Sequence, residues 1–212
     1  PIVLASTTTG TLTISNAGAT PIFSGGVTGT NNLTINNPNS SSIMTFSTAI
    51  LNNIGTITNA GTGNAGVTIS SVIGTNVTGV IQNSSTSTLT LSGINTFTSG
   101  LTIKSGTVKG QTDANAFGGS GTGTITLGDS AGGSNNATLV AGSALTFANP
   151  IVLAANTTGI LNIIDLDGVN AGFSGGVTGN NNFVIQATGG SGRTVTFSGG
   201  SINNAGTVRT LS

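Results

Sequence analysis

Asp165 and Asp167 are the only carboxylates close together in this sequence of 212 residues. With one residue between them, both side chains would point to the same face of a β-strand. Paired carboxylates at this spacing suit Ca²⁺ binding or acid and base catalysis, as in β-helical enzymes that cleave glycans. Arg193, the next cation along the chain, is 26 residues beyond Asp167. The sequence therefore favours two solvated carboxylates on a strand face, with cation binding as the second interpretation, and we predict no catalytic or metal site.

Two glycine-rich stretches resemble binding motifs. "GTGNAG" at Gly61–Gly66 fits the G-x-G-x-x-G pattern of dinucleotide-binding loops, which requires a following helix and an acid about 20 residues later. Here the strand-like "VTISSVIG" follows, and the next acid is Asp113. "GGSGTGTIT" from Gly118 resembles a Ca²⁺-binding nonapeptide but has Gly123 in place of the ligand aspartate. Both stretches are predicted to be corners between strands, and no cofactor is expected.

The remaining polar side chains have structural explanations as well. Lys104 and Lys109 are predicted to be solvated charges that discourage sideways pairing of sheets. Six asparagines fit the glycosylation pattern: Asn32, Asn39, Asn76, Asn83, Asn136 and Asn156. The abundance of Asn, Ser and Thr gives about this many by chance, so the pattern indicates no modification.

The composition indicates an ordered all-β protein. The chain contains four Lys and Arg, four acidic residues and no His, Cys, Trp or Tyr, while 35% of its residues are hydrophobic. Scarce helix formers argue against helices, and abundant Ile, Val and Thr argue against disorder. So few cations exclude nucleic acid and anionic membranes as partners, and no segment is apolar enough to cross a bilayer as a helix. We expect any export signal to lie outside these residues.

A long repeat organises the chain. "FSGGVTG" occurs at Phe23–Gly29 and again at Phe173–Gly179, an offset of 150 residues. "PIVLASTTTGTLTI" from Pro1 matches "PIVLAANTTGILNI" from Pro150, with an offset of 149 residues. We therefore divide the chain into a repeat unit, residues 1–149, and the start of a second copy, residues 150–212, continuous with the first as one domain.

A shorter period lies within this unit. Triplets of the type apolar, Thr, apolar begin at Leu12, Leu33, Met44, Val67, Leu89, Leu101, Ile125, Leu145 and Val195. In a strand, such a triplet sends two apolar side chains to one face and a threonine to the other. Every second triplet falls about 20 to 24 residues further on, and Gly and Asn clusters separate them, which is turn chemistry.

These features favour a solenoid over a sandwich or an antiparallel barrel, neither of which needs a period. We predict a parallel β-helix of about 20 to 24 residues per coil, because each coil must match the coil below it. At a strand spacing of about 4.8 Å the chain would form a rod of roughly 50 Å. Apolar side chains, including eight phenylalanines, would stack inside it, and corner asparagines would form hydrogen-bonded ladders.

Part of the sequence resembles a known family. "LTLSGINTFTSGLTIKSGTVKG" at Leu89–Gly110, followed by "ANAFGGSGTGTITLG" at Ala114–Gly128, is similar to the passenger-associated transport repeat of bacterial autotransporters. The matching positions are Ser92 and Gly93, then Asn95, Thr96, Phe97 and Thr98, and finally Gly106, Thr107 and Val108. The resemblance implies a secreted, right-handed β-helix on a bacterial surface, carried outward by a C-terminal membrane barrel, with these residues as an internal slice of the passenger.

Three functional classes follow. We predict a non-enzymatic structural protein, a segment of an extracellular stalk, fibre or surface layer whose rods associate with copies of themselves, since a formal charge near zero opposes assembly little. An adhesin that holds a cell-surface glycan is the alternative. A third hypothesis, ice binding, rests on Thr-x-Thr pairs that begin at Thr11, Thr56, Thr88, Thr96 and Thr124.

Overall fold

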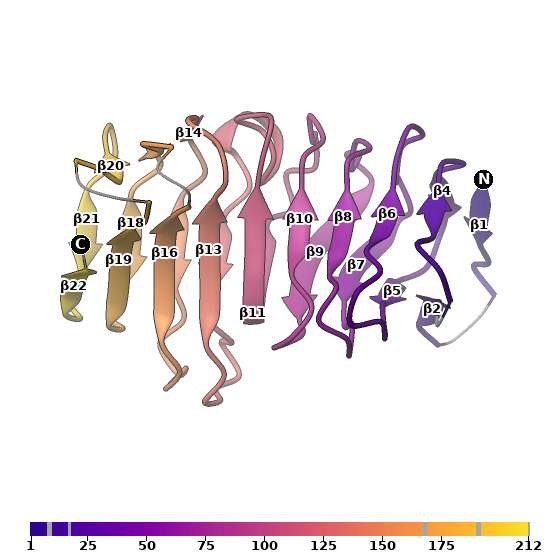
Figure 1. Cartoon of the computed structure of the whole chain (residues 1–212), viewed down its shortest axis with the longest axis horizontal. Helices are drawn as coiled ribbons and strands as arrows, with labels where there is room; N and C mark the ends of the chain where they lie inside the picture. The colour runs from indigo at the N-terminus through magenta and orange to yellow at the C-terminus, as the bar shows by residue number, and fades with distance from the viewer. Residues whose placement is uncertain (8–9, 17, 167–168, 190–191, 212) are drawn as a thin grey trace.

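The computed structural model describes residues 1–7, 10–16, 18–166, 169–189 and 192–211. In these residues the secondary structure consists of short β-strands and one short 3₁₀-helix, η1 (Gly119–Gly121), and every strand pairing is parallel. The strands stack in about eight turns along the rod in Figure 1. The predicted parallel β-solenoid is therefore confirmed. Within the described residues, no helix is long and apolar enough to cross a membrane.

Each turn contributes one segment to each of three columns, which we name faces A, B and C. Face B consists of β2 (Leu12–Ser15), β5 (Leu33–Asn36), β7 (Gly55–Asn59), β9 (Val77–Asn83), the first half of β11 (Leu101–Gly110), β12 (Ile125–Leu127), β15 (Ile151–Leu153), β18 (Val177–Gly179) and β21 (Ile202–Asn204). Face C consists of β3 (Ile22–Phe23), β6 (Met44–Phe46), β8 (Val67–Ile69), β10 (Leu89–Leu91), the second half of β11, β13 (Ala137–Ala141), β16 (Leu161–Asp165), β19 (Phe183–Ala187) and β22 (Val208–Leu211).

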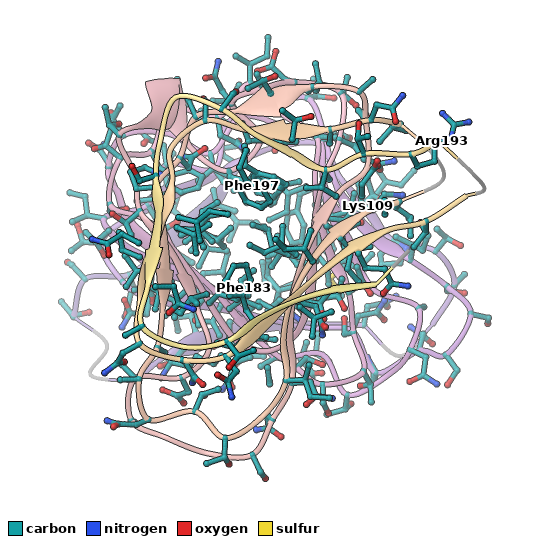
Figure 2. All side chains as sticks on the ribbon, turned by 90° about the vertical axis from the view of Figure 1, so that its left-hand side faces the viewer. Lys109, Phe183, Arg193 and Phe197 are labelled. Atoms are coloured by element: carbon teal, nitrogen blue, oxygen red, sulfur yellow. The ribbon has the colours of Figure 1, made fainter. Side chains whose placement is uncertain are left out.

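Face A is the least regular column. It contains β1 (Ile2–Leu4) and β4 (Val27–Gly29) at one end, and β14 (Thr146–Phe147), β17 (Gly172–Phe173) and β20 (Thr196–Phe197) at the other. Between them the column continues through isolated bridges at Leu51 and Ile73 and through single backbone hydrogen bonds to Thr96 and Gly119. Figure 2, which looks along the rod, shows the three-sided outline and a bore filled with side chains.

Strand parity places the apolar side chains in the bore. In β6, Met44 and Phe46 are fully buried, whereas Thr45 between them is half-buried on the outer surface. The inward column of face B runs in register through Leu12, Leu33, Ile57, Val80, Leu101, Ile125, Ile151, Val177 and Ile202. These residues are 21 to 26 positions apart, so the later coils are longer than predicted. The added length lies in enlarged corners such as residues 128–136.

Phenylalanines form the inner column of face A towards the C-terminus. The ring centroids of Phe117 and Phe147 are 4.6 Å apart, those of Phe147 and Phe173 5.8 Å, and those of Phe173 and Phe197 5.7 Å. Offset and tilted ring pairs at such distances add to the stability gained by burial. The predicted stacking of phenylalanines in the bore is therefore confirmed for this column.

Equivalent segments of the two repeat copies lie on neighbouring faces of the rod. The first "FSGGVTG" joins β3 on face C to β4 on face A, whereas the second joins β17 on face A to β18 on face B. β1 is the first strand of face A and its counterpart β15 is the seventh strand of face B, so the offset corresponds to six turns plus one face. The same sequence thus serves different corners of the rod.

Equivalent residues nevertheless make equivalent contacts. Asn31 Nδ2 donates to Ala5 O at 3.2 Å in the first copy, and Asn181 Nδ2 donates to Ala154 O at 2.8 Å in the second. Gly26 and Gly176 both turn the corner with a positive φ, 73° and 78°, which glycine adopts at little cost. The three corners are therefore close enough in shape to accept one sequence.

Candidate functional site

Asp165 is buried, which corrects its interpretation as a solvated carboxylate. Its side chain is fully shielded from solvent, and Oδ2 accepts a hydrogen bond from the Asn170 N–H at 2.9 Å, while Oδ1 has no partner. Asp167 lies outside the described residues. The reason is parity: Leu161 and Ile163 point into the bore, so Asp165, two residues further along β16, points inward as well.

The acidic residues form no metal centre in the part of the chain that is described. There, no group of three potential His, Cys, Asp or Glu ligands comes together. Asp165 instead accepts the backbone N–H of Asn170, a residue that follows β16 in the chain. Its strand neighbours are Ala141 and Ala187, so small side chains surround the carboxylate in the column.

Both glycine-rich stretches are corners, as predicted. Gly61–Gly66 joins β7 to β8, and no helix follows it. The stretch from Gly118 joins face A to β12 and contains only η1. Neither stretch has the strand, loop and helix arrangement that holds a dinucleotide phosphate.

The two lysines differ in their surroundings. Lys104 is not an isolated solvated charge, because its Nζ lies 3.4 Å from Asp129 Oδ1, with both side chains partly exposed. An ion pair of this kind contributes little to stability. Lys109 lies on the outer surface of β11 in register with Val140, and Figure 2 places it on the same side of the rod as Arg193.

Several corner asparagines bind the backbone of a neighbouring turn, although Asn39 Nδ2 also donates to Asn37 Oδ1 within one corner, at 3.1 Å. Among the glycosylation-pattern residues, Asn32 Oδ1 accepts from the Thr56 N–H at 2.9 Å, and Asn136 Oδ1 accepts from the Ile160 N–H at 2.8 Å. The prediction of side-chain ladders is therefore wrong for these two asparagines. They do link neighbouring turns, but through the backbone rather than through a second asparagine side chain. An amide pair of the predicted type does join Asn59 Nδ2 to Gln82 Oε1, at 2.8 Å.

A buried polar cluster lies between faces B and C. Gln82 Nε2 donates to the backbone oxygens of Ser84 and Ser87 at 2.9 and 2.6 Å, and Ser84 Oγ donates to Gly61 O. Asn59 and Gln82 stand at inward positions of β7 and β9, in a column otherwise occupied by Ile and Leu over these turns. The sequence did contain a signal for this cluster, because in "ITN" the polar Asn59 stands two residues after the inward Ile57 and must point inward too. The buried amides satisfy backbone groups of the corner loops, which explains them without a ligand.

The Thr-x-Thr pairs are distributed over three faces. The pairs that begin at Thr11, Thr56 and Thr124 lie at face B. Thr90, of the pair that begins at Thr88, lies on face C, and Thr96 lies on face A. The outward column of face B reads Thr13, Thr34, Thr58, Ile81, Thr102, Thr126, Val152, Thr178 and Asn203. Two aliphatic residues thus interrupt this column, and ice binding stays a prediction that a thermal hysteresis measurement can test.

Two adjoining hollows form a notch at the corner between faces B and C. β11 passes this corner without a loop, turning at Gly106, whose φ is 78°. The corner loops of the turns on either side, residues 84–88 and 128–136, project past it. Ser85 and Asn135 line both of the adjoining hollows that result, and the floor contains Thr107. We name this feature the corner notch; the side chains that line it are uncharged and non-aromatic, with hydroxyl and amide groups predominating.

Both ends of the bore are less well covered than its middle. Ile2, Leu12, Ile14 and Phe23 in the first turn are only partly buried, as are Val195 and Phe197 near the last. Ile202 of β21 is 42% exposed. Together with the unpaired edges of the terminal strands, these residues form two end surfaces of the rod.

The fold defines a β-solenoid repeat protein. No protein-family model matches the chain, and no curated protein or solved structure compared with it is significantly similar. Its function therefore has to be argued from its own geometry.

Proposed function

We propose that the chain is a non-enzymatic structural element, a segment of an extracellular bacterial stalk, fibre or surface layer, whose rods associate with one another. The observation that carries the proposal is the regular stacking of parallel coils, in which the inward column of face B continues in register from Leu12 to Ile202 around one hydrophobic core.

The remainder of the surface is consistent with this role. Among the described residues, the charged groups are few and outnumbered by hydroxyl and amide side chains, so repulsion between rods is weak. The bore is filled along the length of the rod by stacked aliphatic and aromatic side chains. A close-packed, regular rod suits a load-carrying or spacing element.

Assembly can be measured directly. We expect sedimentation velocity to show species that lengthen with protein concentration, and negative-stain electron microscopy to show filaments whose width matches a single rod or a bundle of rods. Isolated, monomeric rods at high concentration would contradict the structural role. For the extracellular location, an antibody raised against the chain should label intact, unpermeabilised cells that produce it, and labelling only after lysis would exclude that location.

The corner notch favours an adhesin as the second candidate. Its hydroxyl and amide groups match the hydrogen-bonding chemistry of a neutral glycan, and the absence of charge among the lining side chains disfavours ionic ligands. On a glycan array, binding that disappears in Asn135→Lys and persists in the exposed face-A variant Thr28→Lys would support this candidate. Equal binding by both variants would exclude the notch as the glycan site.

A further inference from the structure

The corner notch has a defined direction on the rod. One of its hollows is lined by Asn83 and Ser105, which are strand partners where face B ends. The other is lined by Thr107 and Thr138, which are strand partners where face C begins. The notch therefore runs around the rod from face B to face C, parallel to β11 and at a right angle to the long axis of the rod in Figure 1.

The missing loop sets the width of the notch. Loops 84–88 and 128–136 form its walls, and they join strands that pair with β11 from opposite sides. Two strand spacings of about 4.8 Å therefore separate the walls, which gives about 10 Å between their backbones. An α-helix with its side chains is about 10 to 12 Å wide and would not enter, whereas a single extended chain fits. The hollows have volumes of about 360 and 420 Å³.

Hydrogen bonds fix both walls without a ligand. In the first loop, Ser84 Oγ accepts from the Ser87 N–H at 2.9 Å. In the second loop, Ser130 O accepts from Asn156 Nδ2 of the next turn at 2.9 Å. A preformed site loses little conformational freedom on binding, so more of the contact energy contributes to affinity.

The side chains that line the notch keep their hydrogen-bonding groups available, in contrast to the corner asparagines that bind a neighbouring backbone. Five of them form no side-chain hydrogen bond within the part of the chain that the structure describes: Asn83, Ser85, Thr107, Ser134 and Asn135. Three hydroxyls and two amides can therefore donate to a ligand and accept from it.

This chemistry favours a sugar chain over other extended ligands. The backbone of β11 is paired with β9 and β12 on face B and with β10 and β13 on face C, so an added peptide strand would find no free edge. Among the described residues that line the notch, none is charged or aromatic, which disfavours anionic and apolar ligands. An uncharged chain rich in hydroxyl groups matches the site.

We propose that the corner notch binds an unbranched, neutral polysaccharide that crosses the rod at a right angle to its axis, with neighbouring sugar units in the two hollows. This rests on the second candidate function, glycan binding, and adds the length and direction of the ligand. Ser85 and Asn135 line both hollows and would contact the linkage between the two units.

The number of sugar units tests the two-hollow arrangement. The probes are neutral β-1,4-linked oligomers of glucose, mannose and N-acetylglucosamine, from one to six units, in isothermal titration calorimetry. We expect an affinity at least about tenfold higher for four units than for one, because the second hollow adds contacts without a second loss of translational freedom. Equal affinity for one unit and six would overturn the arrangement. Stronger binding of anionic galacturonate oligomers would overturn the neutral class.

Lysine variants test the path of the ligand. Asn83→Lys blocks the hollow at face B and Thr107→Lys the hollow at face C, and each should lower the affinity for the six-unit chain at least about tenfold. The matched control is Thr178→Lys, at an exposed outward position of face B three turns further on, which should bind normally. Far-ultraviolet circular dichroism verifies folding, and Ser134→Lys replaces Thr107→Lys if that variant does not fold.

The outcomes separate this proposal from the others. A loss in only one of the two notch variants would overturn the transverse path. Binding that is equal in all variants would overturn the notch as the site but leave glycan binding intact. A chain that binds none of the oligomers would overturn both this proposal and the second candidate function, whereas filaments seen in the assembly experiment would still support the structural role.

Discussion

At the scale of single residues, the structure explains why polar side chains occur inside the bore. Asn95 is 1% exposed and bridges three turns: its Oδ1 accepts from the Ile73 N–H at 2.8 Å, and its Nδ2 donates to Ala116 O at 2.7 Å. It replaces the strand pairing that face A lacks in this region. The Asn-Thr-Phe segment of the repeat-like motif thus has a physical role in this chain, whatever its ancestry.

Asn95→Ala should destabilise the rod strongly. The substitution leaves a buried N–H and a buried carbonyl without partners, at a cost of about 3 kcal/mol in the free energy of unfolding. Chemical denaturation followed by circular dichroism measures the change. Asn203→Ala, at an exposed position of β21, is the matched control and should change the free energy by less than about 0.5 kcal/mol. Equal effects of the two variants would contradict the bridging role.

Gly106→Ala tests the corner at which β11 turns. The residue has a φ of 78°, and an added Cβ would collide with the backbone oxygen of Ser84. We expect a loss of more than about 1 kcal/mol from the backbone strain alone. Gly10→Ala, where an added Cβ meets no atom within 4 Å, should be nearly neutral in the same denaturation experiment. A stable Gly106→Ala protein would show that the corner is not as tight as described.

At the scale of elements, the period of the sequence was sufficient to predict strands, corners and their parallel stacking. Triplets such as Met44–Phe46 predict which side chains point inward, and Gly and Asn clusters predict where the chain turns. The orientation of Asp165 could also have been read from Leu161 and Ile163. The corner notch could not have been predicted from the sequence, because it forms where β11 passes one corner without a loop while the neighbouring turns have loops there.

The phenylalanine column of face A provides a test at this scale. Phe147 is fully buried between Phe117 and Phe173. Phe147→Ala removes a large side chain from a close-packed bore and should lower the free energy of unfolding by about 3 to 5 kcal/mol. Ile94→Ala, on a side chain that is 60% exposed, should cost less than about 1 kcal/mol by the same measurement. Similar values for both would contradict the assignment of inside and outside.

At the scale of the whole molecule, the repeat and the turn do not share a period. A unit of about 150 residues advances by six turns and one face, so equivalent corners point in different directions around the rod. The sequence revealed the long repeat and the coil separately. It did not reveal on which face each repeated segment lies, because corner loops of unequal length change the number of residues in each turn. Any partner that recognises the repeated corner would meet it on two sides of one rod.

The central claim is that successive strands in the sequence belong to different faces and pair only with strands one turn away. Nuclear Overhauser contacts between backbone protons of an isotope-labelled, monomeric sample test this most directly. The solenoid predicts contacts between β5 and β7, with Thr34 opposite Thr58, and none between the backbones of β5 and β6. Contacts joining Thr34 to Thr45 in an antiparallel hairpin of β5 and β6 would contradict the solenoid and everything inferred from it.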